Sequence, residues 1–94
     1  MRVRWTRRAL RALDAITDYI AQDRPIAAER VLAKVHESVA ALADHPHLGR
    51  AGRVADTREL IVPGTSLIVP YRLVEDQIQI LTVLHAARKW PAQF

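Results

Sequence analysis

The stretch of residues 57–90 constrains the fold more than any other part of the chain. It contains three apolar runs, at residues 58–62, 66–74 and 77–85, which are separated by the turn signals Pro63-Gly64 and Glu75-Asp76. Short apolar runs bounded by such residues are typical of β-strands, and a tight turn reverses the chain direction between them. The sequence therefore predicts an antiparallel meander of three strands.

Pro70 interrupts the middle run of this meander. Because proline has no N–H to donate to a neighbouring strand, it predicts a bulge or a locally unpaired position there. The last run alternates polar and apolar residues at 77–80 and then becomes apolar on both faces at 81–84. We therefore expect this strand to begin half-exposed and to end buried.

The first half of the chain predicts one short strand and two helices. Val3 and Trp5 alternate with arginines, as in a strand over residues 2–5. Apolar residues then recur at the helical period over residues 7–22, and again from Pro25 to about Asp44. Because the break between these segments is short, the two helices should form an antiparallel hairpin.

The apolar stripe of this hairpin needs a surface to pack on, and the predicted sheet offers the only large one. The sequence therefore predicts an α+β fold of two layers, in the order β-α-α-β-β-β, with an antiparallel helix hairpin packed on an antiparallel sheet. The length of 94 residues suits a single domain over residues 1–94.

Arginine dominates the charge of the chain. The net charge is +4, and Lys34 and Lys89 are the only lysines. Because arginine makes forked contacts with phosphate and carboxylate, we expect an acidic partner. The sequence has no cysteine, no apolar run long enough to cross a membrane and no secretory signal pattern. These features predict a cytoplasmic protein that has no membrane partner.

The residue patterns of metal and cofactor sites are missing. Among the four histidines, His45 and His47 come nearest to a metal site, and only Asp44 and Asp56 accompany them. Neither a nucleophile elbow nor a glycine-rich phosphate loop is present. We therefore expect no metal and no cofactor.

One route to catalysis is acid–base chemistry. RNA can be cleaved through its own 2′-hydroxyl by a base, an acid and cations that stabilise the phosphorane charge. The candidate catalytic residues are His85, Arg72, Arg58 and Arg88. Two alternatives stay open: His85 as a structural residue at a strand end, and the arginines as ion-pair partners of Glu59 or Asp76.

Binding is the other class of function. The candidates to contact a target or an acidic protein are Arg50, Arg53, Arg58, Arg72, Arg88, Lys89 and Trp90. Trp90 and Phe94 form either core contacts or an exposed anchor, and for Trp90 a place in the core is favoured.

Five features, taken in order, resemble the RelE/ParE superfamily of toxins from type II toxin–antitoxin systems. They are the short strand ending near Trp5, the hairpin broken at Asp23-Arg24-Pro25, the loop His45-Pro46-His47-Leu48-Gly49-Arg50, the strand Thr57-Arg58-Glu59-Leu60 before Pro63-Gly64, and Pro70-Tyr71-Arg72 leading to Val83-Leu84-His85-Ala86-Ala87-Arg88-Lys89-Trp90. The resemblance covers essentially the whole chain. Together these motifs are fairly specific for this superfamily.

The resemblance implies a toxin that is neutralised by an acidic antitoxin. The disordered end of the antitoxin would fold over the helix hairpin and the sheet in a hetero-oligomer. ParE-like members poison DNA gyrase and are not hydrolases, whereas RelE-like members cleave mRNA on the ribosome. An inactive member that only binds its antitoxin is a third alternative.

The hairpin, the loop and the V-L-H-x-x-R end are closer to ParE, which implies a ParD-like antitoxin. No tyrosine follows Tyr71, and Arg50 and Arg53 stand where the RelE loop has a lysine pair. The resemblance therefore favours gyrase over ribosome-bound mRNA as the target.

Overall fold

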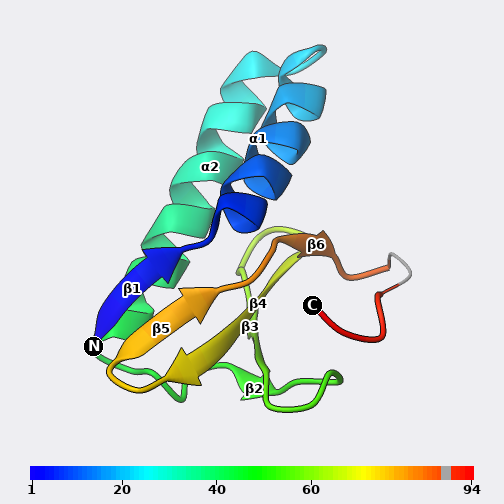
Figure 1. Cartoon of the computed structure of the whole chain (residues 1–94). Helices are drawn as coiled ribbons and strands as arrows, with labels where there is room; N and C mark the ends of the chain where they lie inside the picture. The colour runs from blue at the N-terminus through cyan, green and yellow to red at the C-terminus, as the bar shows by residue number, and fades with distance from the viewer. Residues whose placement is uncertain (88–89) are drawn as a thin grey trace.

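Two helices lie together on one face of a six-stranded sheet in the computed structural model, which describes residues 1–87 and 90–94 (Figure 1). The elements are β1 (Arg2–Trp5), α1 (Arg7–Ala21), α2 (Pro25–Ala40), the 3₁₀ turn η1 (Ala41–Ala43), β2 (Arg50–Ala51), β3 (Arg58–Ile61), β4 (Leu67–Val74), β5 (Gln77–Ile80) and β6 (Leu84–His85). This arrangement confirms the predicted two-layer α+β fold.

Both helices begin where the sequence places a start signal. The Thr6 hydroxyl accepts a hydrogen bond from the Ala9 backbone N–H at 3.1 Å, which caps α1, and donates to the Ile80 carbonyl at 2.7 Å, which ties the cap to β5. Pro25 is the first residue of α2, where its missing N–H has no consequence. The second helix ends at Ala40 and tightens into η1, earlier than the predicted end near Asp44.

The sheet order is β1-β5-β4-β3-β2, and β6 also pairs with β4. The predicted antiparallel meander is confirmed by the pairs β3–β4 and β4–β5. However, β1 pairs with β5 in parallel, so the sheet is mixed and not wholly antiparallel. The two helices between β1 and the meander supply the long connection that parallel pairing requires. The short strand β2 was not predicted, and it forms inside the expected loop by pairing with β3.

The expected irregularity at Pro70 is confirmed. Tyr71 pairs with Ile80 and Ile68 pairs with Leu84, so the two residues between them on β4 oppose the three residues 81–83. This bulge divides the predicted last strand into β5 and β6. Next to the bulge, the Leu81 backbone N–H donates to the Pro70 carbonyl at 3.0 Å, so the proline serves only as an acceptor.

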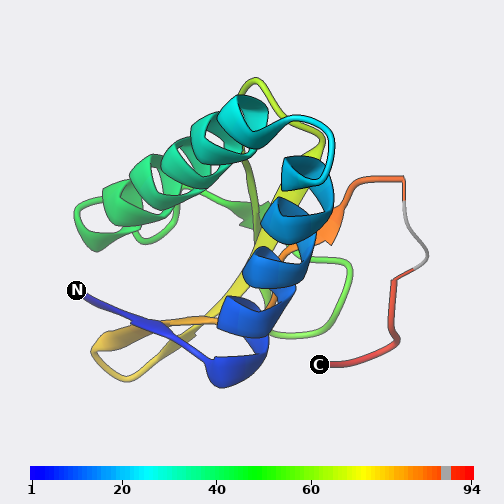
Figure 2. The ribbon, with the colours of Figure 1, turned by 90° about the horizontal axis from the view of Figure 1, so that it is seen from above.

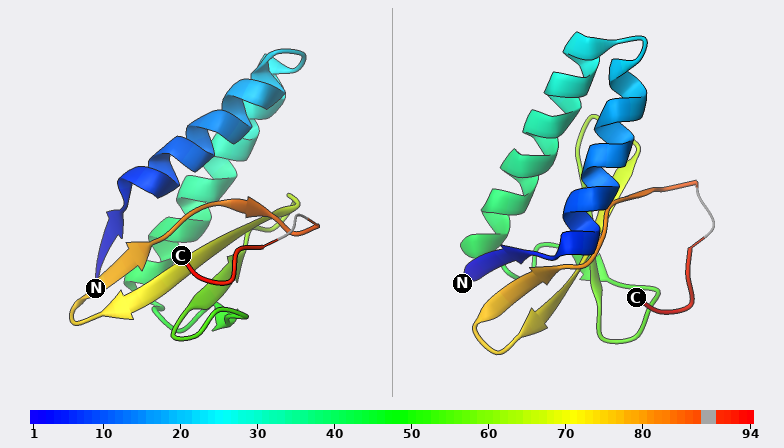
Figure 3. Two further views of the ribbon diagram at one scale, coloured as in Figure 1. Left: turned by 45° about the vertical axis from the view of Figure 1, so that its right-hand side comes forward. Right: turned by 45° about the horizontal axis from the view of Figure 1, so that its top comes forward.

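The core lies between the helix hairpin and the near face of the sheet (Figures 2 and 3). Its buried residues include Leu13 of α1, Val35 and Val39 of α2, and Val69 and Tyr71 of β4. Because side chains alternate along a strand, the intervening residues point away from the helices. In the part of the chain that the structure describes, no helix has the length and apolar character needed to span a bilayer.

Candidate functional site

A buried carboxylate organises one end of the sheet. Glu59 of β3 is only 2% exposed, and its Oε1 accepts hydrogen bonds from Arg50 Nε and Nη2 at 3.1 and 3.0 Å. Its Oε2 accepts from the Arg53 backbone N–H at 2.8 Å and from Arg53 Nε at 3.1 Å. Glu59 therefore holds the loop that carries both arginines against the sheet.

Glu59 remains ionised in this setting. Burial by itself raises the pKa of the Glu59 carboxyl, but the hydrogen bonds from the Arg53 backbone and guanidinium and from Arg50 outweigh it, and the pKa lies below its usual value. A carboxylate with a lowered pKa is a poor proton donor near neutral pH. The ion pairs of Glu59 involve Arg50 and Arg53 and not its sequence neighbour Arg58, which was one alternative raised by the sequence.

The C-terminal segment joins this cluster through Trp90. The guanidinium carbon of Arg53 lies 3.6 Å from the centroid of the Trp90 ring, a close cation–π contact. The rings of Trp90 and Phe94 are 6.4 Å apart. Trp90 is half-buried, and it packs on the Arg53 side chain and not in the core between helices and sheet.

The loop before β2 is fixed by a buried tyrosine. The Tyr71 hydroxyl donates to the Pro46 carbonyl at 2.8 Å and accepts from the Gly49 N–H at 2.8 Å. Burial raises the pKa of Tyr71, although the Gly49 hydrogen bond and the charge of Arg58 oppose the rise. A Cβ on Gly49 would lie 2.6 Å from Tyr71 Cε1, so the close approach requires glycine.

The structure does not gather the three described candidates for RNA cleavage. Arg58 lies on the helix-facing side with Tyr71, where its Nη1 donates to the Gly49 carbonyl at 2.6 Å. Arg72 follows Tyr71 on β4 and belongs to the opposite side of the strand, but at this end of the sheet it lines one pocket together with Arg58. His85 pairs with Leu67 at the far end of β4, and its Nδ1 is 3.3 Å from Ser66 Oγ. Arg88 and Lys89 lie outside the described residues.

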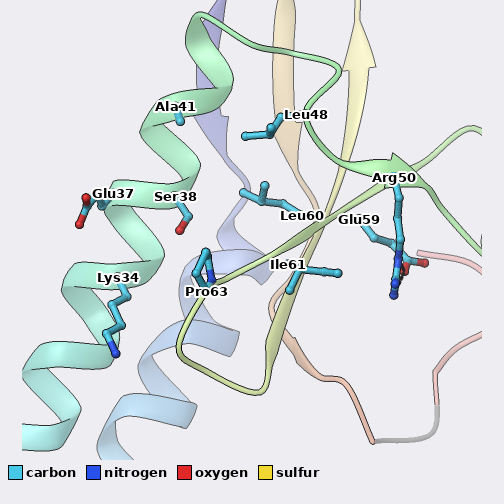
Figure 4. A pocket seen from close by; sticks show the side chains of 10 residues that line it. All are labelled: Lys34, Glu37, Ser38, Ala41, Leu48, Arg50, Glu59, Leu60, Ile61 and Pro63. Atoms are coloured by element: carbon cyan, nitrogen blue, oxygen red, sulfur yellow. Dashed lines mark hydrogen bonds and ion pairs between the residues drawn. The ribbon is translucent and has the colours of Figure 1, made fainter.

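An open groove lies between α2 and β3 (Figure 4). Its volume is about 550 Å³, and its lining is mainly apolar. Leu48 and Ile61 belong to this lining although they are 57% and 52% exposed. Lys34 and Glu37 stand along the α2 side. An apolar groove with charged residues on both walls suits an amphipathic peptide segment.

Sequence reasoning missed this groove and the organising roles of Gly49 and Tyr71. The available signal was two large apolar residues at exposed positions, Leu48 in a loop and Ile61 on a strand. These residues could be assigned to one groove only once the fold had placed β3 beside α2.

Known proteins resemble this chain over most of its length. The family model described as "ParE toxin of type II toxin-antitoxin system, parDE" matches residues 3–90. The chain is 51% identical over 90 residues to "Putative toxin Y4kP" of Sinorhizobium fredii, covering 96% of this chain and 93% of that protein. It is 38% identical over 84 residues to "Toxin RelE2" of Caulobacter vibrioides, covering 89% and 93%.

A solved structure described as "Chromosomal ParDE TA system from P. aeruginosa" has the same fold. Its TM-score is 0.82 at 30% sequence identity, over 90% of this chain and 95% of that chain.

Proposed function

Because the chain belongs to the ParE family of type II toxin–antitoxin toxins, we propose that it inhibits DNA gyrase in the cytoplasm and is neutralised by a ParD-like antitoxin. The observation that carries the choice of target is the separation of His85 from the candidate arginines. Arg58 and Arg72 line one pocket at one end of the sheet, whereas His85 pairs with Leu67 at the far end of β4. General acid–base cleavage needs these groups within hydrogen-bond reach of one phosphate.

The apolar groove supports the antitoxin part of the proposal. Leu48 and Ile61 are large apolar side chains that are more than half exposed, and they flank a concave surface beside α2. A partner segment that folds on binding gains free energy by covering such residues. The net charge of +4 favours an acidic partner and makes its association faster at low salt.

A matched pair of variants tests the groove. Ile61→Glu places a charge where the antitoxin would bury an apolar side chain, so we expect the dissociation constant to rise at least about tenfold. Ile26→Glu makes the same change at a residue that is 64% exposed and does not line the groove, and it should leave binding unchanged. Isothermal titration calorimetry measures both. Equal losses in the two variants, or none in Ile61→Glu, would remove the groove from the antitoxin interface.

The name of the Caulobacter relative, "Toxin RelE2", keeps cleavage of ribosome-bound mRNA as a second candidate. His85, Arg72, Arg58 and Arg88 remain the candidate residues for that reaction. Primer extension on translated mRNA tests it, with His85→Ala as the informative variant. Cuts at defined codons that disappear in His85→Ala would support the nuclease. Intact message beside inhibited gyrase would reject it, and a chain with neither activity would be an inactive antitoxin-binding member.

A further inference from the structure

One half of the sheet face that points away from the helices is open and carries arginines. Strand pairing places Arg72, Gln79 and Arg4 in one row across β4, β5 and β1. The next row holds Val74, Gln77 and Arg2. We call the surface formed by Arg2, Arg4, Arg72, Gln77 and Gln79 the arginine face.

The orientation of this face follows from the rows that alternate with it. One such row, before Arg72, consists of Tyr71, Ile80 and Trp5, and the other, between the two rows of the face, consists of Leu73, Ile78 and Val3. All six belong to the core between sheet and helices or pack against it. Because cross-strand partners share a side of the sheet and neighbours along a strand alternate, the arginine face points to the opposite side.

The two halves of this side of the sheet differ in what covers them. Glu59, Ile68 and Pro70 lie on the same side but are buried, at the end where the β2 loop and Trp90 pack. By contrast, Arg2 and Arg4 are exposed, and Arg72, Gln77 and Gln79 are half-exposed. The arginine face is therefore accessible.

The charges on this face are not neutralised by ion pairs. Among residues 1–87 and 90–94, the ion pairs found are those of Glu59 with Arg50 and Arg53. Glu75 and Asp76 lie in the turn at one end of the face and form no ion pair with its arginines. Because neighbouring strands are about 4.8 Å apart, the backbones at Arg4 and Arg72 are about 10 Å apart, with Gln79 between them.

The residue types point to a backbone-phosphate ligand. Arginine and glutamine side chains contact phosphate and sugar oxygens without reading sequence. The face carries no aromatic ring, so it lacks the stacking platform that single-stranded bases require. Val74 is the one large apolar side chain exposed in its two rows, whereas the lining of the groove between α2 and β3, which suits a peptide, is mainly apolar.

We propose that the arginine face binds the phosphate backbone of double-stranded DNA. The choice of DNA rests on the proposed action on gyrase, an enzyme that holds duplex DNA. Because this face and the groove lie on different parts of the molecule, the antitoxin and DNA have separate sites. The toxin would then contact both the protein and the DNA of its target complex.

The test measures binding of the full-length toxin to a short mixed-sequence DNA duplex by fluorescence anisotropy. The variant is the triple substitution Arg2→Gln, Arg4→Gln, Arg72→Gln. The control is Arg11→Gln, Arg24→Gln, Arg30→Gln, which removes the same charge from exposed positions on the helices and the turn between them. Circular dichroism confirms that both variants fold. A single variant, Gln79→Glu, adds a negative charge to the centre of the face while retaining every arginine.

We expect the triple variant to bind at least about tenfold more weakly than the control, and Gln79→Glu to bind more weakly than wild type. The slope of log K against log salt is negative, and losing three phosphate contacts lowers its magnitude by about 2.7. Wild-type affinity should then fall about 40-fold more than that of the triple variant between about 50 and 200 mM salt. Equal slopes for the triple variant and the control would overturn the proposal, because they would reflect net charge alone.

Two further outcomes separate this inference from the proposed function. Duplex binding with the expected slope but without gyrase inhibition supports the DNA site and rejects the target. Gyrase inhibition by a toxin that does not bind duplex DNA rejects the site and supports the target.

If the triple variant instead loses antitoxin affinity and keeps duplex binding, the face belongs to the antitoxin and the proposal fails. Tighter binding to an RNA duplex of the same sequence also contradicts it.

Discussion

Replacing Glu59 with glutamine tests whether one buried carboxylate holds the β2 loop and the C-terminal segment in place. Glu59 accepts five hydrogen bonds from Arg50 and Arg53, and glutamine would present an amide N–H₂ to guanidinium groups that only donate. The shape of the side chain is kept, so the substitution isolates the charge.

The magnitude follows from the exposure of the partners. Removing one member of a fully buried ion pair costs about 3–5 kcal/mol, because the other charge is left without a partner. Here the side chains of Arg50 and Arg53 are 51% and 45% exposed, so water replaces part of what they lose. We therefore expect Glu59→Gln to lower the free energy of unfolding by about 2–3 kcal/mol.

Urea denaturation followed by tryptophan fluorescence measures this loss, with Trp90 reporting on the loop through its contact with Arg53. Glu29→Gln is the control, because Glu29 is exposed on α2, and it should change stability by less than about 0.5 kcal/mol. A loss in Glu59→Gln no larger than in this control would refute the reasoning.

The pH dependence gives an independent check of the sign. The pKa of Glu59 is lowered in the folded state, so its contribution is present above the unfolded pKa of about 4.3 and is lost as pH falls through the folded pKa. The stability difference between wild type and Glu59→Gln should therefore be full near pH 7 and shrink below about pH 4. A difference that does not change with pH would mean that the charge is not the cause.

Four further substitutions test the loop anchor and the core. Tyr71→Phe leaves the Gly49 N–H and the Pro46 carbonyl without their partner and should cost about 1–3 kcal/mol in urea denaturation, whereas a neutral result would show that water replaces the phenol. Gly49→Ala brings a methyl group 2.6 Å from Tyr71 Cε1 and should cost about 1–3 kcal/mol; a stable variant would show that the loop shifts freely. Leu13→Asp or Val39→Asp places an unpaired charge at a residue 2% exposed and should abolish the folded circular dichroism spectrum, so retention of a cooperative melt by either variant would contradict the two-layer packing.

The fold was predictable because its local signals agree with one another. The helix break before Pro25, the cap at Thr6 and the turns after β3 and β4 each depend on residues close in sequence. The parallel pairing of β1 with β5 and the short strand β2 depend on where distant segments meet. No local periodicity specifies the edge at which a four-residue strand adds to the sheet.

The candidate site was only partly predictable for the same reason. The arginines were identifiable by type, but Arg50 and Arg53 converge on Glu59 only because the loop folds back over β3. Arg4 and Arg72 are far apart in sequence and share a row only through their common neighbour Gln79 on β5. Residue types can therefore indicate an acidic partner, whereas strand register decides which arginines act together.

The most direct test of the proposed function is a supercoiling assay with purified gyrase, relaxed plasmid and the full-length toxin. We predict that the toxin inhibits supercoiling, that equimolar cognate antitoxin restores it, and that His85→Ala inhibits as well as wild type, because no catalysis by His85 is required. Unaffected supercoiling, together with cuts in ribosome-bound mRNA that are lost in His85→Ala, would contradict the account.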